Sequence, residues 1–511
     1  MEQFDKNTVT PQKAPQGPKR VNLWLAIAVF ASLVVIIVAA GVFIYNKKSG
    51  DYGSNYSYDR TKVVKDSDRQ KGDKNDTSVQ DNSVQDDKQD AMEDDDQQGD
   101  TVVSDDLFSS VFALHFSNRH AANQQMATMV DDLDVHDYRY DIVLEELNYA
   151  EIDEIMEGYS ESDTVLVTIH NQRDNPVYPE NMDEYLDTVT DLAVRYQEKV
   201  DIWQISNEVY GGPGIHWWGT KEQYVVMLNN AYAAIKEVVP DVLVAPSGIA
   251  TGTLADPNSL SDLPDPSSVP AFVSNPEILD DATLQSMGRE AEEFMAYVWT
   301  YGQFDPIIDM HVYDSPEALT IRIPWLDEQL QKYGIDGQII LTETASIDLR
   351  IYGKINPFST EEEYALQASD LVKRYTYIAD SVAVTGMWHG AYKEQEKAQG
   401  IVSGFVVGSE GYKRPVYYTF ELFKQTVEGY SDLEMLDEGV YRYIVNGEEV
   451  FVVWSDTDTT LNLDPYIQDT EVTVSYIVTE LDESNNPIYP ADAVVDTKAV
   501  PVLETPIIIK K

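Results

Sequence analysis

The chain of 511 residues contains no cysteine, and it has only seven histidines. A disulfide framework, a thiolate metal site and a cysteine nucleophile are therefore excluded. None of the histidines forms a His-x-His or His-Glu-x-x-His spacing, so the common sequence signatures of a zinc site are missing as well. We accordingly expect neither a cofactor nor a metal.

Basic residues are also few, with 36 Lys and Arg against 89 Asp and Glu, which gives a formal net charge of -53. The imbalance is uneven along the chain: residues 1–48 carry +4, residues 49–106 carry -10, and the remainder carries -47. A surface this acidic repels a phosphate backbone. We therefore expect no nucleic-acid partner.

The chain has one long apolar run, from Leu23 to Tyr45, interrupted only by Ser32 and Gly41. It is long enough to cross a hydrocarbon core of about 30 Å. Its length exceeds that of the apolar part of a cleaved signal peptide, which favours an uncleaved signal anchor over residues 23–45. We expect a short cytoplasmic tail at residues 1–22, a single pass through the cell membrane, and the catalytic part outside the cell.

Residues 46–106 are rich in Asp, Gln, Ser, Asn and Lys and contain a near-repeat at 78–82 and 83–87. A segment of this composition cannot bury a core. We predict a disordered acidic linker that holds the rest of the chain away from the membrane.

After residue 107, short β-branched runs alternate with longer amphipathic stretches, which is typical of repeated βα units. Eight strands are predicted at residues 111–116, 136–143, 165–170, 202–207, 242–246, 307–311, 339–342 and 383–388. The clearest helices are predicted at 182–196, 221–239, 283–301, 324–333, 360–379 and 415–426. This order predicts an α/β fold, a TIM (β/α)8 barrel over residues 107–429.

The pattern changes at residue 430, beyond which only strand-like runs separated by turn residues remain. Strands are predicted at 440–445, 449–454, 471–478 and 502–509. We expect a C-terminal all-β sandwich over residues 430–511 that serves as an accessory domain.

Two acidic residues end predicted strands of the barrel. Glu208 follows the fourth strand, and Glu343 ends the seventh. Carboxyl ends of all strands in such a barrel meet at one face, so both side chains are predicted to project into the same mouth. Two facing carboxyl groups are what cleavage of a glycosidic bond requires. Either residue alone could equally well terminate a strand or cap a helix.

The sequence around these acids resembles the retaining (β/α)8-barrel glycoside hydrolases of the 4/7 superfamily (clan A). The resemblance rests on Asn207-Glu208 after strand four and Glu343 after strand seven. It implies that Glu208 is the acid/base, that Glu343 is the nucleophile, and that Asn207 binds the substrate 2-hydroxyl. Ser206 and Val209 flank the pair where many relatives carry Asn-Glu-Pro, so the subfamily is unassigned.

Four further positions match this family. Arg139 resembles the strand-two arginine beside the nucleophile, and Trp388 resembles the strand-eight tryptophan that floors a sugar subsite. His311-Val312-Tyr313 resembles the strand-six His-x-Tyr, which makes His311 and Tyr313 candidate binding residues.

Histidines and tryptophans supply the remaining candidates. Four of the seven histidines fall at predicted strand ends and suggest a polar pocket in which His170 binds substrate: His115, His170, His311 and His389. They also leave open a metal-dependent TIM-barrel hydrolase. Trp217 could stack on a sugar ring or form part of the core at the start of a helix.

These patterns predict a membrane-anchored retaining glycosidase that cleaves O-glycosidic bonds of a β-linked glycan or oligosaccharide by double displacement. An alternative is a catalytically inactive carbohydrate-binding barrel tethered at the cell surface. The separation of Glu208 and Glu343 distinguishes the two, because retaining catalysis requires carboxyl groups about 5 to 5.5 Å apart.

Overall fold

The computed structural model describes 107–116, 129, 131–172, 178–211, 217–250, 281–313, 315–345, 360–389, 392–393, 404–407, 412–467 and 469–510. These residues belong to one compact unit, residues 97–511. The tail, the signal anchor and the linker predicted at residues 1–22, 23–45 and 46–106 lie outside the described residues. Among the helices that the structure does describe, none is long and apolar enough to cross a bilayer.

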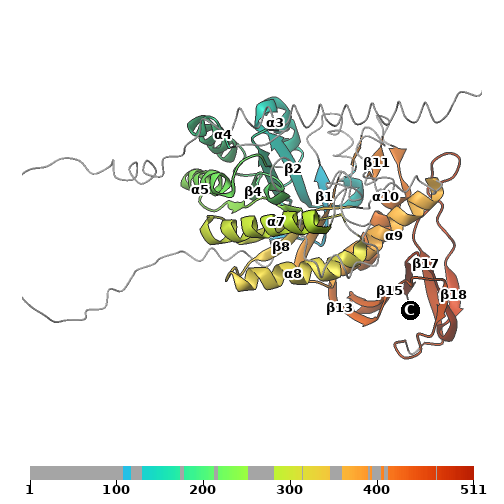
Figure 1. The fold of residues 1–511 in the computed structure, drawn as a ribbon. Helices are drawn as coiled ribbons and strands as arrows, with labels where there is room; N and C mark the ends of the chain where they lie inside the picture. The colour runs from blue at the N-terminus through green and yellow to red at the C-terminus, as the bar shows by residue number, and fades with distance from the viewer. Residues whose placement is uncertain are drawn as a thin grey trace, which may run out of the picture. The chain divides into compact units, whose positions relative to one another are not determined.

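A parallel sheet forms the centre of this unit, with helices around it (Figure 1). Its strands follow the predicted positions closely: β1 (Phe112–Phe116), β2 (Asp137–Val143), β3 (Thr164–His170), β4 (Ile202–Ile205), β5 (Leu243–Ala245), β6 (Ile249–Ala250), β7 (Ile307–Val312), β8 (Gln338–Thr344) and β9 (Ala383–His389). The predicted fifth strand corresponds to β5, and the short strand β6 that follows it was not predicted, so β8 is the seventh predicted strand and β9 the eighth.

The sheet closes into a barrel between its two edge strands, β5 and β6. Its order is β5-β4-β3-β2-β1-β9-β8-β7-β6, which places β5 and β6 at opposite edges. Only three residues separate Ala245 from Ile249, a path of roughly 14 Å at most, so the two edges must lie together. Asp305, just before β7, donates its backbone N–H to the carbonyl of Val244 on β5 at 2.8 Å. The predicted α/β barrel is confirmed.

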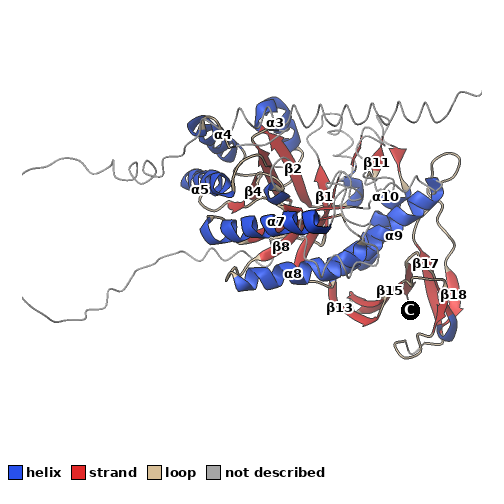
Figure 2. Cartoon of the chain, in the orientation of Figure 1, coloured by secondary structure: helices blue, strands red, loops and turns tan. Residues whose placement is uncertain are grey.

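The helices of the barrel are α3 (Tyr149–Glu157), α4 (Met182–Arg195), α5 (Lys221–Val238), α7 (Asp281–Tyr301), α8 (Leu319–Lys332), α9 (Thr360–Ala379) and α10 (Pro415–Val427) (Figure 2). Helix α3 was not predicted. Helix α8 begins five residues before the predicted start, and Pro324 lies inside it. Burial of Leu319 and Ile323, both 0 % exposed, offsets the hydrogen bond that proline cannot donate.

Alternating residues of the strands face either the helices or the barrel interior. The interior begins with an apolar layer and continues, two residues further along the strands, with a polar one. The apolar layer contains Leu166, Ile202, Ala245, Ile307 and Ile340. The buried polar layer contains Thr168, Gln204, Asp309 and Thr342. The interior is therefore closed at its base and polar toward the carboxyl ends of the strands.

An irregularity in β8 changes this alternation. Asp309 pairs with Ile340, but His311, two residues on, pairs with Glu343, three residues on. The same shift appears against β9, where Leu341 pairs with Gly386 and Thr344 with Trp388. This extra residue in β8 is a bulge. In a regular strand, Glu343 would point to the helix side of the sheet, because its neighbour Thr342 points to the barrel interior.

The C-terminal part is built around one six-stranded antiparallel sheet in the order β13-β14-β15-β20-β17-β18. Its strands are β13 (Tyr430–Asp437), β14 (Val440–Val445), β15 (Glu448–Val453), β17 (Glu471–Tyr476), β18 (Ala493–Asp496) and β20 (Ile507–Lys510), and β16 (Thr459–Leu461) pairs separately with β19 (Val500–Val502). Three short strands, β10 (Tyr392–Lys393), β11 (Val406–Val407) and β12 (Tyr412–Lys413), form a separate small sheet.

The six-stranded sheet differs from the predicted sandwich in its layers. One face packs on the barrel helices: Tyr441 contacts Tyr377 of α9, and Tyr443 contacts Phe423 of α10, with ring centroids 6.1 and 6.4 Å apart. The opposite face forms a separate core with Val500 and Val502 of β19. Helices therefore take the place of a second large sheet.

Because the barrel and the C-terminal sheet share this apolar contact, Tyr443→Ala should destabilise both together. Tyr443 is 0 % exposed, and removal of a buried aromatic ring costs about 3 to 5 kcal/mol. Urea unfolding of the full chain followed by tryptophan fluorescence measures this loss. The matched control is Val494→Ala, which is 70 % exposed and should change the unfolding free energy by less than about 0.5 kcal/mol. An equal effect of the two substitutions would contradict this account of the interface.

Candidate active site

Glu208 is positioned by a strained turn after β4. Ser206 has φ 69° and Glu208 has φ 49°, both in the left-handed region that residues other than glycine seldom occupy. The turn is held from behind, since Val209 donates its N–H to the Ser247 hydroxyl at 3.1 Å and the Tyr224 hydroxyl donates to the Ile205 carbonyl at 2.9 Å. Strain of this kind costs of order 1 to 3 kcal/mol per residue and clusters at functional sites.

Glu343 reaches the interior through the bulge in β8 and is 6 % exposed. Its Oε1 lies 3.1 Å from Nη1 of Arg139, and its Oε2 accepts a hydrogen bond from the Tyr313 hydroxyl at 2.5 Å. Burial, followed by the negative charges of Glu343 and Glu208, holds the pKa of Tyr313 well above its ordinary value, so the phenol remains a donor.

The two predicted acids are brought together. One carboxylate oxygen of Glu208, one of Glu343 and a ring nitrogen of His311 all lie within 4.8 Å of one another. Glu208 is 1 % exposed. The sequence placed these residues on different strands, and the closed barrel makes them neighbours.

Arg139 lies at the centre of the site and is 0 % exposed. Besides Glu343, its guanidinium donates to Asp141 Oδ1 at 3.1 Å, to Thr342 Oγ1 at 2.5 Å and to Asn207 Oδ1 at 2.8 Å. Burial alone would lower its pKa, but the carboxylates of Asp141, Glu343 and Asp309 outweigh burial and raise it. Arg139 is therefore the fixed cation of the site, and Asn207 is oriented by it.

His311 connects the acids. Its Nδ1 lies 2.7 Å from Glu208 Oε1, and its Nε2 lies 3.0 Å from Asp309 Oδ2. Burial tends to lower the pKa of this imidazole, but the charges of Glu343 and Asp309 outweigh burial and raise it to about 10. His311 is therefore an imidazolium at neutral pH and donates from both ring nitrogens.

Asp309 is a site residue that the sequence interpretation missed. Its carboxylate accepts hydrogen bonds from Gln204 Nε2 at 2.8 Å, from the Thr342 backbone N–H at 2.8 Å and from the Thr342 hydroxyl at 2.6 Å. Burial raises its pKa, but His311 and Arg139 prevail and lower it to about 2. The available signal was an acid inside the apolar run Ile307-Ile308-Asp309-Met310.

A glycine fits against this pair from the side of β6. A β-carbon at Gly248 would overlap Nε2 of His311 and Oδ2 of Asp309. Only a residue without a side chain allows the backbone to approach the two groups this closely.

A second polar cluster lies at the ends of β1, β2, β3 and β9. His115 Nε2 lies 3.1 Å from Asp141 Oδ2, and His115 Nδ1 lies 2.7 Å from Nδ1 of His389. His389 Nδ1 lies 3.7 Å from Glu343 Oε2, and His170 Nε2 lies 3.7 Å from Asp141 Oδ1. The predicted polar pocket is thus assembled from His115, His170 and His389, together with an aspartate that was not singled out.

The ionisation of this cluster follows from its neighbours. Burial lowers the pKa of His115 despite the nearby Asp141. Burial raises the pKa of Asp141, but Arg139 and His115 outweigh it and hold the pKa well below its ordinary value. At neutral pH the cluster therefore presents a neutral His115 hydrogen-bonded to an ionised Asp141.

Two predicted binding residues do not face this site. Trp388 is 0 % exposed and stacks on Phe405 with ring centroids 5.6 Å apart. Its neighbour His389 takes the inward position on β9, because adjacent strand residues point to opposite faces. Trp217 is 1 % exposed, donates from Nε1 to the Thr220 carbonyl at 3.2 Å and packs edge-on against Tyr224. Both rings are buried: Trp217 follows the alternative of a place in the core, and Trp388, expected to floor a sugar subsite, packs on Phe405 instead.

Within the part of the chain that the structure describes, two clusters contain enough donor groups for a metal ion: Glu208, His311 and Glu343, and His115, Glu343 and His389. The first does not suit a cation, because Arg139 Nη1 lies 3.0 Å from His311 Nε2 and 3.1 Å from Glu343, and because both nitrogens of His311 are engaged. In the second, the two Nδ1 atoms face each other at 2.7 Å, which leaves no room between them for an ion with bonds of about 2.1 Å.

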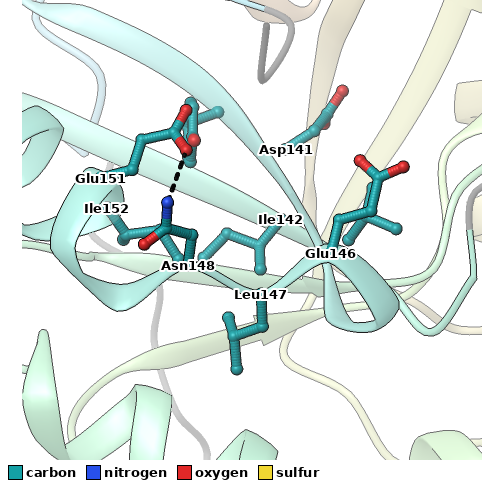
Figure 3. A pocket seen from close by; sticks show the side chains of 9 residues that line it. Asp141, Ile142, Glu146, Leu147, Asn148, Glu151 and Ile152 are labelled. Atoms are coloured by element: carbon teal, nitrogen blue, oxygen red, sulfur yellow. Dashed lines mark hydrogen bonds between the residues drawn. The ribbon is translucent and has the colours of Figure 1, made fainter. Parts of the chain in front are cut away.

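A shallow hollow beside β2 is separate from this site (Figure 3). It is lined by residues 140–143, 146–148, 151 and 152. Asn148 donates to Glu151 across it at 3.4 Å, and Asp141 is the one site residue that reaches it. Neither Glu208 nor Glu343 lines it, so it plays no part in bringing the two acids together.

The buried ion pairs predict a dependence of stability on pH. The pKa of His311 is raised from 6.5 to about 10, so its contribution is complete below pH 6.5 and is lost as the pH rises toward 10. We expect the free energy of unfolding to fall between pH 6.5 and pH 9 by more than about 1.4 kcal/mol, the equivalent of one pKa unit.

Urea unfolding of the full chain at both pH values measures this change. His311→Gln is the control, since it should remove most of the difference between the two pH values. A wild-type stability that is flat over this range would show that His311 is not charged in the folded chain.

No protein-family model and no curated protein sequence matches the chain. Solved structures do match in fold. A glucosidase from Croceicoccus marinus is 13 % identical, with a TM-score of 0.51, over 79 % of this chain and 96 % of its own. A protein named BuGH86, in complex with neoagarooctaose, is 11 % identical, with a TM-score of 0.50, over 78 % of this chain and 73 % of its own. The chain thus has a fold that occurs in glycoside hydrolases.

Proposed function

We propose that this chain is a retaining glycoside hydrolase in which Glu343 is the nucleophile and Glu208 the acid/base. The observation that carries the proposal is the approach of the two carboxyl groups, which have oxygens within 4.8 Å of each other in the mouth of the barrel. Retaining enzymes hold their carboxyl groups about 5 to 5.5 Å apart, whereas inverting enzymes need about 6.5 to 9.5 Å to admit a water.

In the first step, Glu343 attacks the anomeric carbon while Glu208 protonates the departing glycosidic oxygen. The contacts of Glu343 with Arg139 and Tyr313 suit its role as nucleophile, because each partner donates to one oxygen of Glu343 and so favours the ionised form. They also hold the carboxylate in a single orientation. A fixed nucleophile avoids part of the entropy cost of reaching the transition state.

In the second step, a water molecule takes the place of the departed group. As Glu208 removes a proton from it, the water oxygen attacks the anomeric carbon, the bond from that carbon to Glu343 breaks, and the Glu343 carboxylate is restored. Glu208 enters this step as a carboxylate, with its Oε1 2.7 Å from Nδ1 of the His311 imidazolium. The positive charge favours this ionised form and so supports the role of base.

The polar cluster of His115, Asp141, His170 and His389 adjoins Glu343 on the side of β1, β2 and β9. We propose that its donors and acceptors bind hydroxyl groups of the sugar that is attacked. Asn207, held by Arg139, would bind the 2-hydroxyl. A β-linked neutral glycan or oligosaccharide is the proposed substrate class, and the related folds of a glucosidase and of BuGH86 with its bound neoagarooctaose support a carbohydrate ligand.

We further propose that residues 23–45 anchor the chain in the cell membrane and that residues 46–106 act as a spacer, with the barrel outside the cell. The apolar length of the first segment, broken only by Ser32 and Gly41, supports this arrangement. In fractionated cells the full chain should sediment with membranes and resist carbonate extraction, whereas a chain lacking residues 1–48 should be released. Equal release of both chains would contradict the anchor.

Covalent trapping tests the catalytic proposal directly. Incubation with a panel of 2-deoxy-2-fluoro β-glycosides that carry a dinitrophenolate leaving group should add one glycosyl unit to the chain, on the peptide that contains Glu343. Mass spectrometry measures the adduct. Glu343→Gln should not be labelled, and its turnover should fall at least 1,000-fold, because it lacks the ionised nucleophile.

Glu208→Ala provides the matched variant. It should still form the adduct with an activated leaving group. External azide should restore turnover, because it attacks the anomeric carbon of the adduct without the help of a base and releases a glycosyl azide. Binding of glycans without labelling or turnover would identify an inactive carbohydrate-binding barrel. Complete loss of wild-type turnover on addition of EDTA would favour a metal-dependent hydrolase.

A further inference from the structure

We propose that Asp309 is a positioning residue that acts on Glu208 through His311, so that the proton of the acid/base is presented to the substrate and not to the protein interior. This inference rests on the proposed role of Glu208. The three groups form a buried line, with Asp309 Oδ2 3.0 Å from His311 Nε2 and His311 Nδ1 2.7 Å from Glu208 Oε1. Their exposed fractions are 0, 1 and 1 %.

The Asp309 carboxylate cannot turn away from this line. Gln204 and Thr342 donate three hydrogen bonds to it, and Gln204 is itself held by a hydrogen bond from the Thr168 hydroxyl to its Oε1 at 2.7 Å. Gly248 closes the site from β6. Oδ1 is fixed by the Thr342 N–H, and Oδ2 by Gln204 and the Thr342 hydroxyl, so the carboxylate is held with Oδ2 toward His311.

The surroundings of His311 keep its ring doubly protonated. Asp309 on β7, Glu343 on β8 and Glu208 after β4 supply negative charge, Arg139 on β2 supplies positive charge, and Tyr313 is the neutral phenol on Glu343. The charges of Glu343 and Asp309 raise the pKa of the imidazole to about 10, although burial alone would lower it. The Nδ1 proton therefore points at Oε1 of Glu208, 2.7 Å away.

This arrangement determines which oxygen of Glu208 can carry the catalytic proton. Since Oε1 already accepts the Nδ1–H bond, a proton on Glu208 resides on Oε2, the oxygen that His311 does not occupy. Transfer of that proton to the departing glycosidic oxygen leaves a carboxylate that the imidazolium stabilises. If Asp309 lost its charge, His311 would be neutral more often, and its free Nδ1 lone pair could bind the proton of Glu208 and withhold it from the substrate.

Asp309→Asn tests this role by its dependence on the leaving group. Hydrolysis of an alkyl or methylphenyl β-glycoside needs the acid, and its kcat/KM should fall at least 30-fold. A dinitrophenyl β-glycoside departs without a proton, and its kcat/KM should fall less than 3-fold. A purely structural defect would lower both to the same extent, and that result would overturn the proposal.

Asp305→Asn is the matched control. Asp305 is a second buried aspartate, just before β7, where it accepts from the Val244 N–H at 2.7 Å and pairs with Lys236 at 2.9 Å. Its replacement should lower stability and leave the ratio of kcat/KM for the two substrates unchanged. A change in that ratio equal to that of Asp309→Asn would attribute the effect to general destabilisation and overturn the proposal.

A measurement without turnover separates this inference from the function on which it rests. In the ¹⁵N-labelled full chain at pH 8, the imidazole of His311, assigned with His311→Gln, should show two protonated ring nitrogens, and in Asp309→Asn it should show one. A neutral His311 in the wild type overturns the proposal even if glycosides are cleaved. If both states appear as expected and no glycoside is cleaved, Asp309 controls the proton on His311 and the proposed hydrolase function fails.

Discussion

The buried guanidinium of Arg139 is the interaction on which the site depends. Three buried carboxylates, those of Glu208, Asp309 and Glu343, converge in the barrel, and the partly exposed carboxylate of Asp141 lies beside them. Burial of one unpaired carboxylate would be costly, and mutual repulsion adds to the cost. Arg139 and the imidazolium of His311 make the arrangement possible, and Arg139 does so with fixed donors that reach the ends of two other strands, β4 and β8.

The backbone conformations that place the two acids, the turn after β4 and the bulge in β8, are unfavourable by themselves. A left-handed conformation at Ser206 and Glu208 and a bulge in β8 both depart from regular strand geometry. They persist because the surrounding barrel is well packed: the helix-facing sides of β4 and β8 are buried almost completely, as is the apolar layer below the site. Rigid packing at the base and local strain at the mouth are thus complementary parts of one site.

The division of the barrel into a packed base and a polar mouth also explains what successive residues of each strand do. Ile202, Ile307 and Ile340 fill the interior first, Gln204, Asp309 and Thr342 follow as a hydrogen-bonded support, and the groups that would meet a substrate come last. Each layer orients the next. The support layer contains no residue that the family resemblance singled out, although it fixes the orientation of His311.

The sequence by itself determined the barrel, because the period of βα units and the apolar strands are local patterns that tertiary contacts only reinforce. It also pointed to Glu208 and Glu343, since acids at strand ends are recognisable one strand at a time, whereas Arg139, His311 and Tyr313 were singled out by the family resemblance. Only the tertiary structure decided how these groups pair. Closure of the barrel set the distance between the acids, the bulge in β8 turned Glu343 inward, and Asp309 gained its role from strands distant in the chain. The direction of Trp388 and Trp217 was likewise decided by packing, because an aromatic ring is suited both to a core and to a sugar, and the sequence does not record which surface it meets.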